Sequence, residues 1–258
     1  MVERRPRRLT WLGQAGFRID FEGTSIVIDP WVSPHAERLV PPPPLELAAD
    51  GVDWLLVTHE PLDHLDLPFL PRLRERSPSA RVVLPAPLVP LVEDVVPADL
   101  LVPVLPHESL DLDGLTLHVV PAIHGVTMED AYGDGSALGG APRFVGYVLG
   151  SRRRLYHAGD TIVTPDLRAA LEPLDVQLAL LPINGRDAER EARGIVGNMD
   201  AVEAAELALE VGASWLVPYH WDGFAGNTVP PGSAVEAAAA QLHVLVPARF
   251  ASFELPVR

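Results

Sequence analysis

The chain contains 258 residues, of which 48% are hydrophobic and 21% are charged. This composition is ordinary for a globular protein and leaves room for one large domain or two small ones. The absence of cysteine excludes disulfides, thiolate metal ligands and a cysteine nucleophile. The formal net charge of −15 argues against nucleic-acid binding as the main role, because proteins that bind nucleic acid usually present a basic surface to the phosphates.

Neither a membrane span nor a secretion signal is expected. No apolar run reaches the roughly 18–20 residues that are needed to cross a bilayer. The basic segment at 4–8 is followed by a stretch that Gly, Gln, Arg and Asp interrupt too early for a signal-peptide core. We therefore expect a cytoplasmic protein that acts on a small-molecule substrate, without nucleic-acid or membrane partners. Formation of a homo-oligomer is compatible with the sequence.

The predicted elements begin with a strand-rich N-terminus. Residues 9–21 and 25–29 have the pattern of a hairpin or meander, with a turn between them. The PPPP run at 41–44 is interpreted as a stiff surface loop, and a docking motif for a partner is the alternative.

From residue 53 onward, strand-like and helix-like segments alternate. The strongest helix signal lies at 200–212, where Asp200 and Glu203 form a D-x-x-E capping pattern and Gly212 is a stop signal. The other expected helices lie at 68–76 and 233–242, and a weak one is broken by Pro87 and Pro90. The strand-like segments are 53–58, 81–85, 100–105, 115–122, 144–150, 153–159, 176–182, 215–220, 243–247 and 250–255, and a Gly-rich loop spans 132–142.

This order of elements favours an α/β (α+β) layered protein, with sheet buried between helices. We expect a single domain over residues 1–258, built from two similar halves at about 1–142 and 143–258 that each open with a meander.

Several of the predicted strands run directly into a residue that can bind a metal. These strand-end residues are His59, His124, Asp160 and His220. Ligands in sheet-based folds cluster at strand ends, where a rigid frame brings side chains to one rim. The tight pair Asp63 and His64 follows the first of them. If the strands lie side by side, these side chains converge.

Imidazole and carboxylate ligands suit Zn²⁺, Mn²⁺ or iron, and a catalytic site leaves a coordination position open for water. A metal-bound hydroxide would then serve as the nucleophile at neutral pH. Each residue also has a simpler role available. A strand-end histidine could lie on the surface or form a hydrogen bond, Asp160 could stabilise a turn, and Asp63 could cap the helix that follows.

Taken together, these motifs resemble the metallo-β-lactamase superfamily of metal hydrolases. The H-x-x-x-D-H spacing at 59–64, HG at 124–125, GD at 159–160 and the late His220 carry the resemblance. WLGQAGFRI, IVIDP, THEPLDHLD, VGYVLGSRRRLYHAGDT, the segment through GNM and VPYHWD resemble the L-ascorbate-6-phosphate lactonase-like (UlaG-like) branch. The resemblance implies a four-layer αββα sandwich and the hydrolysis of an ester, lactone or phosphodiester-type bond.

The resemblance also implies a ligand set for two metals. One ion would take Asp63, His64, His220 and a shared Asp160, and the other would take His59, His124, Asp160 and a histidine at position 61. The chain has Pro61 there, which offers no side-chain donor and fixes φ near −65°. Glu60 or a water could fill the gap. We therefore expect one well-held Zn²⁺ or Mn²⁺ ion and a second site that is weaker or empty, with Asp63 and Asp160 as the catalytic residues.

Other residues are assigned by their place beside these motifs. Asp29 ends a strand and is expected to support a ligand histidine from beneath, with a turn role as the alternative. For His157 we favour a structural or supporting role. The polar segment 181–200 could form a pocket wall or a solvated loop. Its candidate substrate contacts are Asn184, Arg186 and Asn198. Trp221, with Trp31 and Tyr132, could line a pocket or pack in the core. The remaining histidines, His35, His107, His118 and His243, are interpreted as surface or turn residues.

Three functions compete on this basis. The favoured one is a metal-dependent hydrolase in which Asp160 or Asp63 shuttles the proton. The second is a catalytically impaired metal-binding or ligand-sensing relative, supported only by Pro61. The third is a nuclease or phosphodiesterase that acts on nucleic acid, against which the acidic charge argues.

Overall fold

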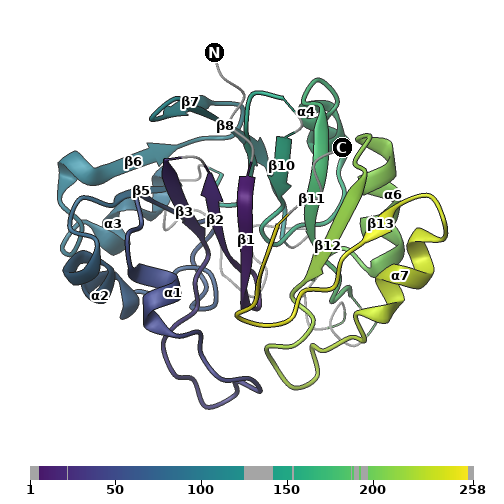
Figure 1. Ribbon diagram of the computed structural model, residues 1–258, viewed down its shortest axis with the longest axis horizontal. Coiled ribbons are helices and arrows are strands. Elements are labelled where there is room, and N and C mark those ends of the chain that lie inside the picture. The colour runs from purple at the N-terminus through teal and green to yellow at the C-terminus, as the bar shows by residue number, and fades with distance from the viewer. Residues whose placement is uncertain are drawn as a thin grey trace.

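The computed structural model describes residues 6–21, 23–124, 142–152, 154–186, 188, 192 and 197–254. Within them the chain forms two seven-stranded sheets that pack face to face, and helices cover the outer face of each sheet (Figure 1). The four-layer αββα sandwich predicted from the resemblance is therefore confirmed.

The first sheet comes mainly from the N-terminal part of the chain, and its strand order is β14-β1-β2-β3-β4-β5-β6. Its strands are β1 (Pro6–Gly13), β2 (Gly16–Phe21), β3 (Thr24–Ile28), β4 (Trp54–Leu56), β5 (Arg81–Pro85), β6 (Leu101–Val104) and β14 (Ser252–Phe253). The first three form an antiparallel meander, and β3 to β6 run parallel. The late strand β14 pairs with β1, with Phe253 opposite Leu9.

The second sheet has the order β13-β12-β11-β10-β9-β8-β7. Its strands are β7 (Ser109–Leu112), β8 (Leu115–Pro121), β9 (Val145–Leu149), β10 (Arg154–His157), β11 (Val176–Pro182), β12 (Trp215–Tyr219) and β13 (His243–Val244). The strands from β10 to β13 run parallel. The chain passes from the first sheet to the second between β6 and β7. The single domain with two similar halves at about 1–142 and 143–258 stays a prediction.

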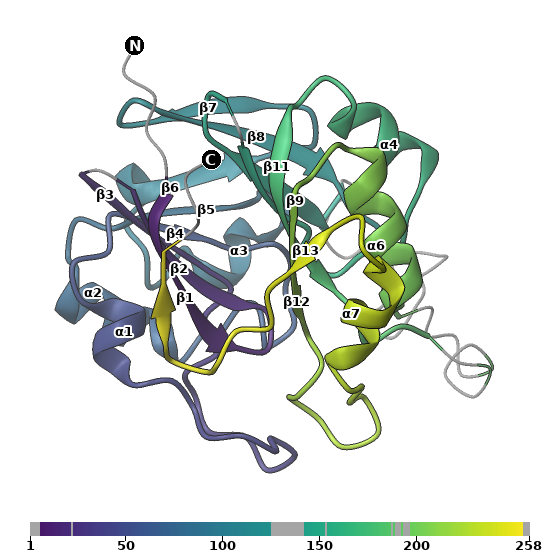
Figure 2. The same cartoon turned by 45° about the vertical axis from the view of Figure 1, so that its right-hand side comes forward.

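Helices from neighbouring parts of the chain cover each sheet (Figures 1 and 2). The first sheet is covered by α1 (Leu45–Ala49), α2 (Phe69–Arg76) and α3 (Val89–Val92), with 3₁₀ turns η1 (Ala86–Leu88) and η2 (Ala98–Leu100). The second sheet is covered by α4 (Pro165–Leu171), α6 (Ala201–Glu210) and α7 (Gly232–Ala238). None of the helices in the described part of the chain has the length and apolarity that crossing a bilayer would need.

Strand periodicity divides the apolar side chains among three cores. In β4, Trp54 and Leu56 enter the core between the sheets, whereas Leu55 packs under the helices of the first sheet. In β11, Leu180 enters the central core and Leu181 packs under the helices of the second sheet. Successive strand residues point to opposite faces, so β4 and β11 are apolar on both faces and contribute to a core on each side of their sheet.

Most expected elements are present with small shifts of their ends. Strands β5 and β11 have the predicted bounds, and α2 begins one residue later than predicted. Helix α7 ends at Ala238 rather than at residue 242, because Ala239 adopts a left-handed φ of 47° that stops the helix. Two helices, α1 and α4, were not predicted. The predicted Gly-rich loop lies outside the described residues except for its last residue, 142.

Candidate metal centre

Five strands deliver a polar side chain to one rim shared by the two sheets. In the first sheet, Asp29 follows β3 directly and His59 lies shortly beyond β4. In the second sheet, His124 follows β8, Asp160 follows β10 and His220 follows β12. Strands β8, β10 and β12 point in the same direction, so the residues after them reach the same edge of the sheet.

Hydrogen bonds and a close backbone approach hold the two rims together. Val145 N donates to Thr58 O at 3.1 Å, and the Tyr147 hydroxyl donates to Val57 O at 2.6 Å. Gly159 has a φ of 62°, and a Cβ on it would lie 2.9 Å from Thr58 Cβ. A glycine at this position therefore provides both the left-handed backbone and the space that the first sheet fills.

The loop after β4 is a turn built on Pro61. The Pro61 carbonyl accepts a hydrogen bond from His64 N at 2.8 Å, and the turn brings Asp63 and His64 to the rim. The Asp66 carboxylate ties the loop to residues 32–33 through hydrogen bonds of 2.6–2.8 Å.

The six predicted ligands meet in two adjoining groups. Within each group the ligand atoms lie within 4.8 Å of one another. The groups are His59–His124–Asp160 and Asp63–His64–His220, and all six residues are buried. Asp160 joins them, because its Oδ2 lies 3.1 Å from His220 Nε2 and 3.7 Å from His124 Nε2. Its Oδ1 lies 3.5 Å from His64 Nε2.

The arrangement passes a simple test for a metal site. His64 Nε2 and Asp160 Oδ1 are fully buried and face each other, yet they have no hydrogen-bond partner among the described residues. Buried polar atoms normally have a partner, and leaving one unpaired costs about 1–3 kcal/mol. Nitrogen and oxygen donors in this arrangement fit a divalent cation of the Zn²⁺ or Mn²⁺ type.

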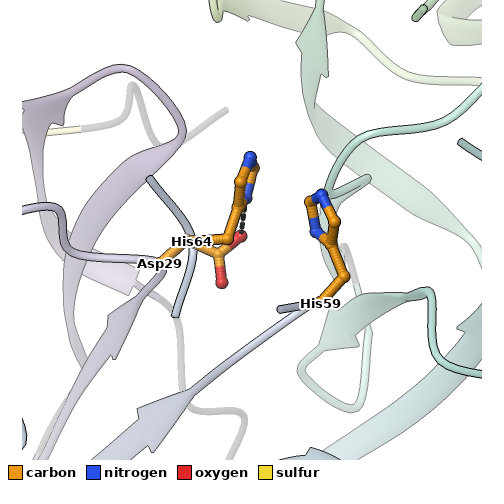
Figure 3. Close-up of side chains that lie close together, drawn as sticks. All are labelled: Asp29, His59 and His64. Carbon is orange, nitrogen blue, oxygen red and sulfur yellow. Dashed lines mark hydrogen bonds and ion pairs between the residues drawn. The ribbon is translucent and has the colours of Figure 1, made fainter. Parts of the chain in front are cut away.

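A carboxylate orients one of the histidines from behind. Asp29 Oδ2 accepts a hydrogen bond from His64 Nδ1 at 2.7 Å, so the Nε2 of that ring is left to face the rim (Figure 3). Asp29 also accepts hydrogen bonds from Thr58 N at 2.9 Å and from the Thr58 hydroxyl at 2.5 Å. The Thr58 hydroxyl lies 2.9 Å from His59 Nδ1, whose ring stands beside that of His64. Such partners fix the ring orientation of metal ligands.

A backbone carbonyl fixes a third histidine. His124 Nδ1 donates to Gly197 O at 2.9 Å, and its Nε2 therefore faces Asp160. Gly197 has a φ of 72°, and a Cβ on it would lie 2.5 Å from Gly185 O. The loop that precedes α6 thus contributes to the site through its backbone.

In the absence of a metal, the electrostatics of the site favour the protonated form of His220 and His64 and the neutral form of His59 and His124. Burial lowers the pKa of His220, but Asp160 and Asp63 outweigh burial and raise it to about 9. Burial also opposes the charge on His64, and Asp160, Asp63 and Asp29 together raise its pKa well above the usual value. These partners in turn hold the pKa values of Asp63 and Asp160 below the usual range, although burial raises them.

Burial favours the neutral form of the other two imidazoles. Burial lowers the pKa of His59 well below 6.5, and its neighbour His64 lowers it further. Burial also lowers the pKa of His124. A metal requires the lone pair of a neutral imidazole, which His59 and His124 already offer, whereas an ion bound by His64 and His220 would displace their protons.

Position 61 is a proline, and the side chain of its neighbour Glu60 contacts Arg143. Glu60 Oε1 lies 2.7 Å from the Nη1 of Arg143, whose side chain is buried over the ring of Phe144. Among the described residues Glu60 is not a member of any group that could hold a metal. The structure therefore gives no support to Glu60 as a substitute for the missing histidine.

The predicted substrate contacts at 181–200 form a hydrogen-bonded cluster next to the site. Asn198 donates to Asn184 Oδ1 at 2.9 Å, and Asn184 donates to Asn227 Oδ1 at 3.0 Å. Arg186 forms a paired contact with Glu203 at the start of α6 and donates to Asn198 O at 3.3 Å. This cluster braces the loop that carries Gly197, and its contact with substrate stays a prediction.

Two of the three aromatic candidates lie within the described residues, and both pack against other aromatic rings. Trp221 packs against Trp11 with ring centroids 4.9 Å apart, and its indole donates to Pro218 O at 3.2 Å. Trp31 stacks on Phe224 at 5.0 Å. Tyr132 lies outside the described residues.

The histidines without a predicted metal role are divided between interior and surface. His157 is buried, and its Nε2 donates to Ala15 O at 2.8 Å. His35, His107 and His243 are exposed, whereas His118 is half-buried and lies 2.8 Å from the Ser109 hydroxyl.

Two residues of the site were missed by the sequence analysis. Thr58 links Asp29 to His59, and its only signal was its place just before the first ligand. Gln14 reaches Asp63 and His220 from the first hairpin. The signal for Gln14 was a polar residue inside the apolar run WLGQAGF.

Comparison with known proteins agrees with this geometry. A family model described as a β-lactamase superfamily domain matches residues 24–221, which is more than half of the chain. This chain belongs to the metallo-β-lactamase superfamily. Its sequence is similar to a UPF0173 metal-dependent hydrolase of Methanoculleus marisnigri, with 31% identity over 217 residues, covering 84% of this chain and 82% of that protein. A UPF0173 metal-dependent hydrolase of Aeropyrum pernix is 29% identical over 235 residues, covering 84% and 83%.

Two solved structures in this superfamily fold share the whole architecture. Igni18, a metallo hydrolase from Ignicoccus hospitalis, matches with a TM-score of 0.75 at 20% identity, covering 98% of this chain and 100% of that one. An isothiocyanate hydrolase from Delia radicum gut bacteria also matches with a TM-score of 0.75, at 17% identity, covering 96% and 99%. At these identities the similarity establishes the fold.

Proposed function

We propose that this chain is a metal-dependent hydrolase that cleaves an ester, lactone or phosphodiester-type bond of a small molecule. The observation that carries the proposal is the convergence of six buried histidines and aspartates at one rim of the sandwich, where His64 Nε2 and Asp160 Oδ1 face each other without a hydrogen bond. Metal-dependent hydrolysis is also the activity named for its sequence relatives.

Each group of ligands has a role in this proposal. Asp63, His64, His220 and the shared Asp160 would hold one Zn²⁺ or Mn²⁺ ion, and His59, His124 and Asp160 would hold a second ion less firmly. When bound, such an ion activates water at neutral pH and polarises the bond to be cleaved.

Other residues of the chain orient the ligand side chains, and one of the ligands transfers protons. Asp29 and the Gly197 carbonyl hold the rings of His64 and His124 in position. Asp63 is the most exposed of the six ligands, at 8%, and its carboxylate is the one placed to pass a proton to or from solvent. Asp160, at 2% exposure, spans both groups and sets their spacing.

Finer assignments belong to the same proposal. The motifs WLGQAGFRI and VPYHWD favour the lactonase-like branch, and Asn184, Arg186, Asn198 and Trp221 are proposed to contact substrate. Fold-level likeness does not transfer specificity, so the substrate must come from assay. The cytoplasmic location expected from the sequence stays a prediction.

Metal analysis and a substrate screen test the proposal together. Protein loaded with Mn²⁺ or Zn²⁺ and then dialysed is expected to retain metal and to hydrolyse at least one of a set of esters, lactones and phosphodiesters. His220→Ala should lose both the metal and the activity, whereas the exposed control His243→Ala should keep both. Full metal retention by His220→Ala would overturn the ligand assignment. A loaded protein that is inactive on every class would favour the impaired metal-binding relative.

A further inference from the structure

Gln14 points into the site from the turn between β1 and β2. The residue is 1% exposed, and its Nε2 lies 2.9 Å from Asp63 Oδ2 and 3.1 Å from His220 Nε2. Asp63 Oδ2 and His220 Nε2 are themselves 3.4 Å apart. The end of the Gln14 amide therefore forms a triangle with two of the proposed metal ligands.

The sides of this triangle have the lengths found between ligands of one ion. Zn²⁺, Mg²⁺ and similar ions bind nitrogen and oxygen at about 2.0–2.2 Å. Two ligands at that distance are about 3.0 Å apart when they meet at a right angle, and about 3.4 Å apart in a tetrahedron. The three separations, 2.9, 3.1 and 3.4 Å, span this range.

The backbone of Gln14 is held in an uncommon conformation that aims the side chain. Its φ is 50°, in the left-handed region that costs a residue other than glycine about 1–3 kcal/mol. Three contacts hold it there. Gln14 O accepts from Trp11 Nε1 at 3.0 Å and from His220 N at 3.3 Å, and Gln14 N donates to Asp222 at 3.4 Å. The surrounding structure thus enforces this geometry at the site.

A glycine makes room for the other end of the amide. A Cβ on Gly223 would lie 2.1 Å from Gln14 Oε1 and 2.5 Å from its Cδ. In the orientation seen, Oε1 is buried without a hydrogen-bond partner among the described residues. The two ends of an amide have nearly the same shape, so a half-turn about the Cγ–Cδ bond exchanges oxygen and nitrogen within the same space.

We propose that Gln14 is a further metal ligand, with its amide oxygen completing the site formed by Asp63 and His220. The inference rests on the metal-dependent function proposed above. A neutral amide oxygen is a hard ligand, and together with two aspartates it shifts the site toward Mn²⁺ relative to Zn²⁺.

Binding constants for Mn²⁺ and Zn²⁺, measured separately by calorimetry, test this assignment. Gln14→Leu keeps the side-chain size but removes the oxygen, and it is expected to weaken Mn²⁺ binding by about tenfold or more, with a smaller loss for Zn²⁺. Gln14→Glu keeps an oxygen ligand and should bind Mn²⁺ at least as tightly as the parent. Gln177→Leu, the same substitution near the start of β11, is the matched control and should change neither constant. Thermal unfolding in EDTA checks that all variants fold.

The outcomes separate this inference from the function on which it rests. Equal losses for both metals in Gln14→Leu and Gln14→Glu would mean that Gln14 only donates a hydrogen bond to Asp63, which overturns the ligand role. Unchanged constants in Gln14→Leu would remove Gln14 from the site altogether. If His220→Ala also bound both metals as tightly as the parent, the proposed metal site itself would be refuted. If His220→Ala lost its metal while Gln14→Leu bound metal normally, only the ligand role of Gln14 would be refuted.

Discussion

The residue at position 61 determines how many ligands the second metal group has. Pro61 has a structural role, since its carbonyl accepts the His64 and Leu65 amides at 2.8 and 2.7 Å and closes the turn that presents the ligands. What it lacks is a side-chain donor for the group formed by His59, His124 and Asp160. That group therefore has three ligand residues where the resemblance implies four.

Replacing this proline by histidine should strengthen the depleted group. Pro61→His is expected to raise the metal content toward two ions per chain, because an imidazole becomes available beside His59 and His124. Elemental analysis after dialysis measures the change. Pro61→Ala is the control, since it removes the ring without adding a donor. If Pro61→Ala raised the metal content equally, backbone rigidity rather than the missing ligand would be limiting. Two tightly held ions in the parent protein would refute the depleted site.

At the scale of elements, helix α6 supports the site from a distance. Asp200 caps the helix by accepting hydrogen bonds from Val202 N and Glu203 N, each at 2.9 Å, and Asp200 N donates in return to Glu203 Oε2 at 3.1 Å. Asp200 also pairs with Asn184 through an isolated β-bridge. The cap therefore stabilises both the helix and the loop that carries Gly197.

Loss of this cap should reduce stability by a known amount. Asp200→Ala is expected to lower the free energy of unfolding by about 1 kcal/mol, because two backbone donors lose their partner. Asp200→Asn should retain most of the stability, since asparagine caps helices almost as well. Urea unfolding of the metal-free variants measures both. An equal loss in the two variants would assign the effect to the carboxylate charge.

Most helices and strands could be predicted from local sequence signals. The pairing of strands that are far apart in the sequence could not. The capping pattern at Asp200 predicted α6, and apolar runs predicted strands such as β5 and β11. Helix α4 was not predicted although Thr164 and Pro165 are a helix start signal, because its seven residues are too few to show a clear helical periodicity. The pairing of β14 with β1 had no local signal, since a strand of two residues is defined only by its neighbour.

The same distinction applies to the site. Histidines and aspartates at strand ends could be picked out from the sequence, because several apolar runs each lead directly into one of these residue types. Gln14 could not, because its residue type is common and its place depends on two features, a left-handed φ and the empty space over Gly223, that appear only in the folded chain.

At the scale of the whole molecule, buried neutral histidines make stability depend on pH. His157 donates from Nε2 to Ala15 O and accepts at Nδ1 from Gly159 N at 3.2 Å, so both ring nitrogens are satisfied only in the neutral form. Burial lowers its pKa below 6.5 in the folded protein. The unfolded chain therefore binds more protons below about pH 6.5, and stability falls as the pH falls through that value.

Replacing His157 should make the free energy of unfolding depend less steeply on pH. In EDTA, His157→Gln is expected to lose stability at pH 7.5 but to show a shallower decline between pH 7 and pH 5, by up to one proton or about 1.4 kcal/mol per pH unit. Urea unfolding at several pH values measures the slope. The exposed control His243→Gln should keep the parent's slope. An unchanged slope in His157→Gln would show that this ring does not oppose protonation.

The division of the ligands between two sheets has a consequence for how the protein is made. The ribosome releases the loop with His59, Asp63 and His64 early, but β12 and His220 only after most of the chain has been synthesised. A nascent or truncated chain therefore cannot offer the complete ligand set. A metal that needs ligands from both sheets would therefore be acquired late in biogenesis, after the second sheet has docked on the first.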